Sequence, residues 1–108
     1  MFKLAIIGGG NMGEALVAGL LADGTATPAG LWVTDVEADR LAALRQRYAI
    51  RTGSDNGEAS SWADVIVLAV KPQVMDRVLD ELKDRLSERT LIISIAAGIP
   101  LSRIAARL

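Results

Sequence analysis

A glycine-rich run near the start of the chain has the spacing of a phosphate-binding turn. The segment Gly8-Gly9-Gly10-Asn11-Met12-Gly13 follows a short apolar run and precedes a stretch with helical periodicity. Between a strand and a helix, Gly8 allows a tight turn, Gly10 lets a pyrophosphate approach the first amides of the helix, and Gly13 lets helix and strand pack closely. The motif predicts a dinucleotide site, and a glycine-rich turn without a ligand is the alternative.

An acidic residue follows where a ribose ligand is expected. Asp35 ends the second apolar run, roughly 20 positions after Gly13, which is the usual spacing in dinucleotide-binding domains. Its carboxylate would accept a hydrogen bond from a ribose 2′-hydroxyl and repel a 2′-phosphate. The residue therefore favours NAD, unless Asp35 is turned aside and Thr34 or Arg40 meets the phosphate. A surface or helix-capping role is the alternative.

Other positions carry weaker signals. Lys71 follows an apolar run at the carboxyl edge of the sheet, where open α/β folds bind ligands. It either contacts an anionic group of a ligand or is a solvated lysine at the end of a strand. The small residues of segment 94–98 either let a flat ring lie against the backbone or form a tight turn. On spacing alone, Asn56 is a turn or cap residue. Trp32 and Trp62 are interpreted as packing residues.

Composition narrows the chemistry. The chain has 108 residues, which suit one domain, with 51% hydrophobic residues, 23% charged residues and a net charge of -1. These values favour a small-molecule partner over nucleic acid or an anionic membrane. The chain contains neither cysteine nor histidine, which rules out disulfides, thiolate metal sites and the usual hydrolase triad. We therefore assign no metal ligand and no catalytic residue.

The start of the chain gives no targeting signal. Its first apolar run is too short and wrongly flanked for a signal peptide, and no run approaches the roughly 18 residues of a membrane span. A cytoplasmic location is the default expectation.

Apolar runs and helical patterns alternate along the chain. Strands are predicted at 4–7, 31–33, 65–70 and 91–95, with a weaker candidate at 50–52. Their continuous apolar character suggests strands covered on both faces, as in a parallel sheet. Helical stripes are predicted over 12–20, 38–48 and 74–86. Right-handed crossovers between these elements predict an α/β, Rossmann-type doubly wound parallel sheet in a single domain.

The last residues begin another element. Pro100 stands where a first helical turn begins, and Leu101, Ile104 and Leu108 start an apolar face before the sequence stops. We therefore expect the domain to be truncated at its C-terminus.

At these motifs the chain resembles the N-terminal dinucleotide-binding domain of pyrroline-5-carboxylate reductases. The resemblance extends over essentially the whole chain and runs through IIGGGNMG at 6–13, DVIVLAVKPQ at 64–73 and ISIAAG at 93–98. Many dehydrogenases share the first motif. The combination of AVKPQ and SIAAG at these separations is specific to this family.

The resemblance implies a function and a set of contacts. The family reduces the C=N bond of 1-pyrroline-5-carboxylate to give L-proline, usually with NADP(H) and sometimes with NAD(H). Many members carry Ser, Asn or Arg near the position of Asp35. Because this chain has a carboxylate there instead, NAD(H) stays possible as its cofactor. A protonated imine is already an electrophile, so no covalent nucleophile is needed. The implied cofactor-binding residues are Ile7, Gly8, Gly9, Gly10, Asn11, Met12, Gly13, Thr34, Asp35, Asn56, Ala69, Val70, Lys71, Pro72, Ala96 and Ala97.

The resemblance also implies missing parts. Family members continue with a further strand segment and a helical domain that resembles a dimerisation module and supplies the substrate-binding loop. The full-length protein is therefore expected to be a homo-oligomer. Because hydride transfer requires both reactants in near-attack geometry, residues 1–108 alone are expected to have little turnover.

Two other functions stay open. A relative of the β-hydroxyacid dehydrogenases would begin with the same turn and helix, although AVKPQ and SIAAG favour the proline enzyme. A non-catalytic module that senses NAD(P)H is the alternative from a different class.

Overall fold

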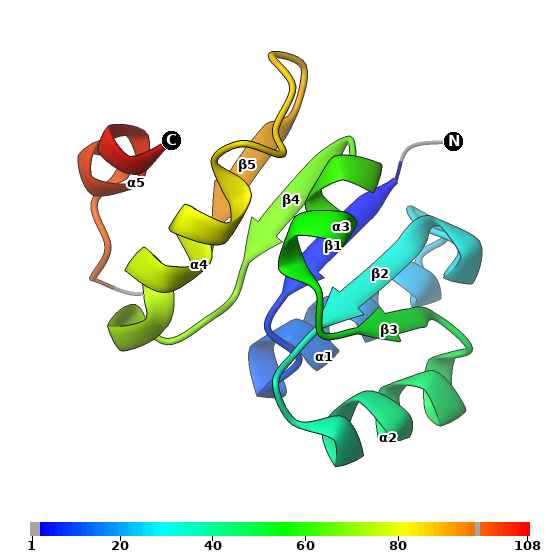
Figure 1. Cartoon of the computed structure of the whole chain (residues 1–108). Helices are drawn as coiled ribbons and strands as arrows, with labels where there is room; N and C mark the ends of the chain where they lie inside the picture. Colours follow the sequence, from blue (N-terminus) through cyan, green and yellow to red (C-terminus); the bar gives the residue numbers. More distant parts are fainter. Residues whose placement is uncertain (1–2, 97) are drawn as a thin grey trace.

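A five-stranded parallel sheet with the order β3-β2-β1-β4-β5 forms the centre of the molecule (Figure 1). The structure is a computed structural model and describes residues 3–96 and 98–108. The strands are β1 (Leu4–Ile7), β2 (Leu31–Thr34), β3 (Arg51–Gly53), β4 (Val65–Leu68) and β5 (Leu91–Ser94). The helices are α1 (Asn11–Ala22), α2 (Ala38–Tyr48), α3 (Asn56–Trp62), α4 (Met75–Leu82) and α5 (Leu101–Arg107), with short 3-10 turns η1 (Pro28–Gly30) and η2 (Pro72–Val74).

Helices cover both faces of the sheet except along β5, where the expected cover on both faces is wrong because the side chains of Leu91 and Ile93 are exposed. Successive side chains of a strand point to opposite faces. In β1, Leu4 and Ile6 pack in a cluster with residues of α1 and α2, whereas Ala5 and Ile7 pack with residues of α3 and α4. All four β1 residues are therefore buried, which explains the uninterrupted apolar run in the sequence. The predicted doubly wound α/β fold is confirmed.

The apolar stripe of α4 is the clearest case of a sequence pattern that packs as expected. Met75, Val78, Leu79 and Leu82 are all buried and belong to the cluster on the α3–α4 face. The helix ends at Leu82 rather than at the predicted residue 86. Leu86 still packs against the same cluster.

One helix was not predicted. The sequence suggests a turn around Asn56, but Asn56 begins α3, and the Asp55 carboxylate caps it by accepting a hydrogen bond from the Glu58 amide at 2.9 Å. The helix has only 7 residues, among them a glycine and two serines, which have low helix propensity. Burial of Ala59 in the core cluster that it shares with strand and α4 residues stabilises the helix instead.

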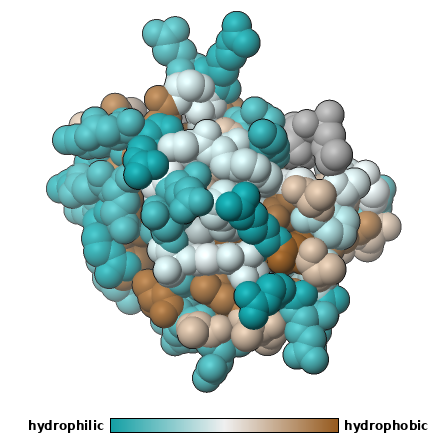
Figure 2. All heavy atoms as spheres, turned by 45° about the vertical axis from the view of Figure 1, so that its right-hand side comes forward, coloured by the Kyte–Doolittle hydropathy of each residue, from teal (hydrophilic) through white to brown (hydrophobic). Residues whose placement is uncertain are grey.

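The face shown in Figure 2 has a pale central area of intermediate hydropathy surrounded mostly by hydrophilic residues, with hydrophobic residues in separate places. None of the helices in the described part of the chain has the length and hydrophobicity of a membrane span.

Candidate functional site

The turn between β1 and α1 lies against the ends of the neighbouring strands. Gly8 has φ +112°, and its amide donates a hydrogen bond to the Thr34 carbonyl at 2.8 Å. A Cβ at this position would lie 2.7 Å from the Ala69 carbonyl oxygen. Glycine is therefore required at residue 8 both by the left-handed backbone and by the close approach to the chain after β4.

Two further glycines fix how the helix leaves the turn. A Cβ on Gly13 would overlap the carbonyl oxygen of Gly8, so α1 packs directly on the turn. Gly10 is the N-cap of α1, and the nearest neighbour of a Cβ there would be Arg40 Nη1 at 3.9 Å. The first amides of a helix lack partners within the helix. Gly10 thus leaves open space beside an N-terminus that suits an anion.

This space belongs to a groove of about 470 Å³ at the carboxyl ends of β1, β2 and β4. Open α/β sheets bind ligands at this edge. The groove brings together ten of the predicted site residues: Ile7, Gly8, Gly10, Asn11, Thr34, Asp35, Asn56, Ala69, Val70 and Lys71.

The other predicted residues lie outside the groove lining. Gly9 is buried beneath the turn, while Met12 is 60% exposed. Gly13 supports the turn from within α1. Pro72 begins η2, and Ala96 packs against the cluster on the α3–α4 face. Ala97 lies outside the residues that the structure describes.

Asp35 is bonded to the chain itself. Its Oδ2 accepts hydrogen bonds from the Gly9 amide at 2.7 Å and from Arg40 Nη1 at 3.2 Å, and its Oδ1 accepts one from the Glu37 amide at 3.0 Å. The side chain is only 8% exposed. Burial raises the pKa of Asp35, but hydrogen bonds from the Glu37 and Gly9 amides and from Arg40 outweigh it and hold the pKa below its usual value.

Arg40 is paired with two carboxylates. Besides Asp35, its Nη2 contacts Glu37 Oε2 at 3.2 Å. The sequence left open whether Asp35 meets the ribose or is turned aside so that Thr34 or Arg40 meets a 2′-phosphate. The structure joins the two residues in one cluster at the groove wall.

A second polar cluster includes Thr34 and Asn56 of the groove lining and Glu81 outside it. Thr34 Oγ1 donates a hydrogen bond to Asn56 Oδ1 at 2.5 Å, and Asn56 Nδ2 donates to Glu81 Oε1 at 3.2 Å. The Asn56 amide therefore links the end of β2 to α4, and its orientation is fixed.

Sequence reasoning missed several groove residues. These are Val36, Glu37, Ser54, Val74, Arg77 and Val78. Position along the chain could have indicated three of them, because Val36, Glu37 and Ser54 come within three residues of the end of a strand. Arg77 and Val78 carry no such signal, because both lie inside α4.

Among the described residues, no group of three or more acidic side chains is placed to hold a metal ion.

Comparison with known proteins identifies the family of this chain. Residues 3–98 match the family described as NADP oxidoreductase coenzyme F420-dependent. The chain belongs to this family. The expected resemblance to the N-terminal NADP-binding domain of pyrroline-5-carboxylate reductases is also confirmed.

Three relatives illustrate the likeness. The chain is 40% identical to the pyrroline-5-carboxylate reductase of Escherichia coli (strain K12) over 103 residues, which are 95% of this chain and 38% of that protein. It superposes on a pyrroline-5-carboxylate reductase from Coxiella burnetii with a TM-score of 0.93 and 40% identity, covering 99% of this chain and 40% of the other. For the Plasmodium falciparum pyrroline carboxylate reductase with NADP bound, the TM-score is 0.84 and the identity is 28%. The match covers 98% of this chain and 37% of the other. The chain thus spans about two fifths of its relatives' length.

Proposed function

We propose that this chain is the cofactor-binding domain of a reductase that converts 1-pyrroline-5-carboxylate to L-proline, with NADPH as the main reductant. The observation that carries the proposal is the β1–α1 turn, where Gly8 and Gly13 fix the backbone and Gly10 leaves the helix N-terminus open to the groove. The relatives named above support the choice of reaction, because the matching domain belongs to pyrroline-5-carboxylate reductases.

The groove fits a dinucleotide on three grounds. The amides at the start of α1 can receive the pyrophosphate. A side chain at Gly10 would enter the space that this group needs. Val36, which is exposed, and Val74 both line the groove and give it apolar surface for a flat base.

Each part of the chain then has a role in holding the cofactor. The turn 8–13 binds the pyrophosphate, Thr34 and Asn56 border the adenosine ribose, and Val70 with Lys71 lines the nicotinamide end. When bound, the reduced nicotinamide supplies the hydride. The chain contributes orientation and electrostatics, and it needs no nucleophile of its own.

We further propose that residues 1–108 alone bind cofactor but turn over little substrate. The longer relatives contain more than twice as much chain. A reaction between two bound molecules needs both in near-attack geometry, and the groove described here is accounted for by the cofactor.

The proposal is tested by titrating the chain with NADPH and with NADH, following nicotinamide fluorescence at fixed ionic strength. We expect saturable binding of NADPH. Gly10→Ala should weaken it by about tenfold, equivalent to about 1.4 kcal/mol. Gly19→Ala is the matched control, because Gly19 lies in α1 with no atom within 4 Å of a Cβ, and should leave the affinity unchanged.

Two outcomes would count against the proposal. A folded chain that binds neither dinucleotide at millimolar concentration would remove the cofactor assignment. Equal effects of Gly10→Ala and Gly19→Ala would mean that binding occurs away from the β1–α1 turn. Turnover of 1-pyrroline-5-carboxylate at the rate of a full-length relative would overturn the claim that this part alone is nearly inactive.

A further inference from the structure

Helix α1 carries an acidic side chain one turn from the end that the pyrophosphate is proposed to meet. Glu14 lies in the first turn of α1, and its amide donates a hydrogen bond to the carbonyl of the N-cap Gly10 at 2.9 Å. A carboxylate in the first turn stabilises a helix, because it complements the positive end of the helix dipole. The same positive end attracts a phosphate. The charge of Glu14 therefore opposes binding of an anion at this turn.

An arginine from another helix offsets this charge. Arg47, in the last turn of α2, contacts Glu14 Oε2 through its Nη1 at 2.7 Å, although the two residues are 33 positions apart in the chain. The hydroxyl of Tyr48 donates a hydrogen bond to the same oxygen at 2.9 Å. Opposite charges this close largely cancel each other's potential at a distance. The α1 N-terminus is therefore shielded from the charge of Glu14 by α2.

The pair lies beside the cofactor groove. Glu14 and Arg47 line a second groove, of about 450 Å³, together with Arg40 and other residues of α2. Arg40 also lines the cofactor groove, and its Nη1 would be 3.9 Å from a Cβ on Gly10. The two grooves therefore meet at Arg40. Because Arg40 is itself paired with two other carboxylates, Arg47 supplies the charge that Glu14 needs.

We propose that Arg47 keeps the α1 N-terminus receptive to an anion by neutralising Glu14, and that it thereby raises the affinity of the chain for dinucleotides. This inference rests on the proposed function. Arg47 does not line the cofactor groove, so it is a positioning residue that acts through Glu14. The pyrophosphate is common to NADPH and NADH, and the pair therefore affects both cofactors in the same direction.

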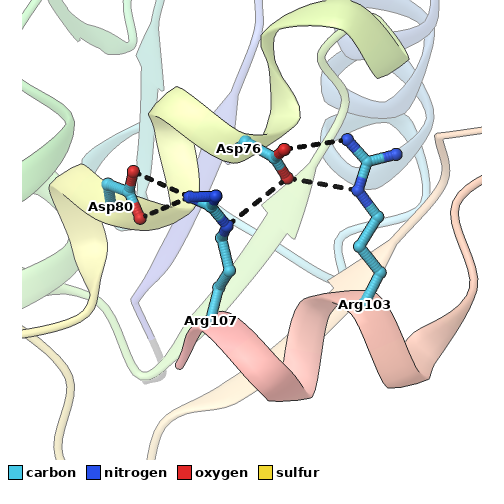
Figure 3. Close-up of polar contacts among 4 residues, drawn as sticks. All are labelled: Asp76, Asp80, Arg103 and Arg107. Atoms are coloured by element: carbon cyan, nitrogen blue, oxygen red, sulfur yellow. Dashed lines mark hydrogen bonds and ion pairs between the residues drawn. The ribbon is translucent and has the colours of Figure 1, made fainter.

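The alternative is that the pair only ties α1 to α2. Figure 3 shows contacts of that kind between the labelled arginines of α5 and the labelled aspartates of α4, none of which lines either groove. The Glu14–Arg47 pair differs because its acidic member stands in the first turn of the helix that is proposed to receive the anion. The two explanations predict opposite results when Glu14 loses its charge: a tie between helices would weaken binding, whereas charge neutralisation would strengthen it.

The test compares the dissociation constants of NADPH and NADH for the wild-type chain, Arg47→Gln, Glu14→Gln and the double variant in about 0.01 M salt. Arg47→Gln leaves a carboxylate without its partner, and we expect both cofactors to bind about threefold more weakly. Glu14→Gln leaves a guanidinium without its partner, and both should bind about threefold more tightly. The double variant should return close to wild type. In about 1 M salt the differences should disappear, because salt screens exposed charges.

Two variants serve as matched controls. Arg45 is another exposed arginine in the last turn of α2, but it lines neither groove, so Arg45→Gln controls for the loss of one positive charge from the same helix end. Tyr48→Phe removes a hydrogen bond from Glu14 without changing any charge. We expect both variants to stay within about 1.5-fold of the wild-type dissociation constants.

The outcomes separate this inference from the proposed function. Binding of neither cofactor by the wild-type chain overturns the proposed function. If the wild-type chain binds them, weaker binding in both Glu14→Gln and Arg47→Gln shows a tie between helices and overturns the role of Arg47 alone. Equal effects of Arg45→Gln and Arg47→Gln, or differences that persist in about 1 M salt, overturn it too. Should Arg47→Gln fail to fold, Glu14→Gln still decides, because only charge neutralisation predicts tighter binding.

Discussion

Asp35 Oδ2 accepts a hydrogen bond from the Gly9 amide at 2.7 Å, so the acidic residue at the end of β2 is bonded to the glycine-rich turn after β1. The residue type that often meets a ribose in this fold here stabilises the loop beside the expected pyrophosphate position.

Removing the Asp35 carboxylate should destabilise the fold. In Asp35→Ala the buried Gly9 amide loses its partner, and we expect the free energy of unfolding to fall by about 1–3 kcal/mol. Asp35→Asn should cost less, since its side-chain oxygen still accepts a hydrogen bond. Urea denaturation measures both. Asp84→Ala is an exposed control, and its free energy of unfolding should stay within about 0.5 kcal/mol of wild type. If Asp84→Ala lost as much stability as Asp35→Ala, the stabilising role of the Asp35 carboxylate would be contradicted.

The same carboxylate makes stability depend on pH. Because the pKa of Asp35 is lower in the folded state than its usual value, its stabilisation is complete above about pH 4, the ordinary range of aspartate. It is lost as the pH falls through the lowered folded-state pKa. We expect the wild-type free energy of unfolding to drop on acidification below about pH 4. The drop should be smaller in Asp35→Asn, and parallel curves for the two proteins would refute this.

Gly8 should tolerate no side chain, whereas Gly19 should accept one. Gly8→Ala combines a left-handed backbone with a 2.7 Å approach to the Ala69 carbonyl, and we expect a loss of about 2 kcal/mol or more in the free energy of unfolding. Gly19→Ala, in the open interior of α1, should stabilise by about 0.5–1 kcal/mol. Thermal or urea unfolding of both variants checks the contrast, and a neutral Gly8→Ala would mean that the turn relaxes freely.

Packing of Ile104, more than the ion pairs, should hold α5 in place. Ile104 is 5% exposed and belongs to the core cluster of the α3–α4 face, so Ile104→Ala should cost about 2–5 kcal/mol. The Arg103 and Arg107 ion pairs lie at the surface, and exposed pairs contribute about 0–1 kcal/mol each. Urea unfolding at low and high salt distinguishes the two. The reverse ranking, with strong salt dependence, would show that charge holds the helix.

The sequence by itself determined the fold and the position of the binding edge. Continuous apolar runs are typical of strands covered on both faces, and they predicted β1, β2 and β4 and the alternation with helices. In β5 the same pattern leaves Leu91 and Ile93 exposed. The glycine spacing predicted the β1–α1 turn, because the backbone conformation and close contacts at Gly8 and Gly13 exclude other residues. These are local constraints, and local sequence carries them.

Tertiary structure alone decided how the charged and polar residues are used. Whether Asp35 faces a ribose or the Gly9 amide depends on how closely the β1–α1 turn approaches the end of β2. Whether the charge of Glu14 is offset depends on α2, which brings Arg47 to it from 33 positions further along the chain. Helix α3 forms despite weak propensity because Ala59 is buried in the core. Side-chain partners of this kind are set by distance in space between segments far apart in sequence, and no periodicity records that distance.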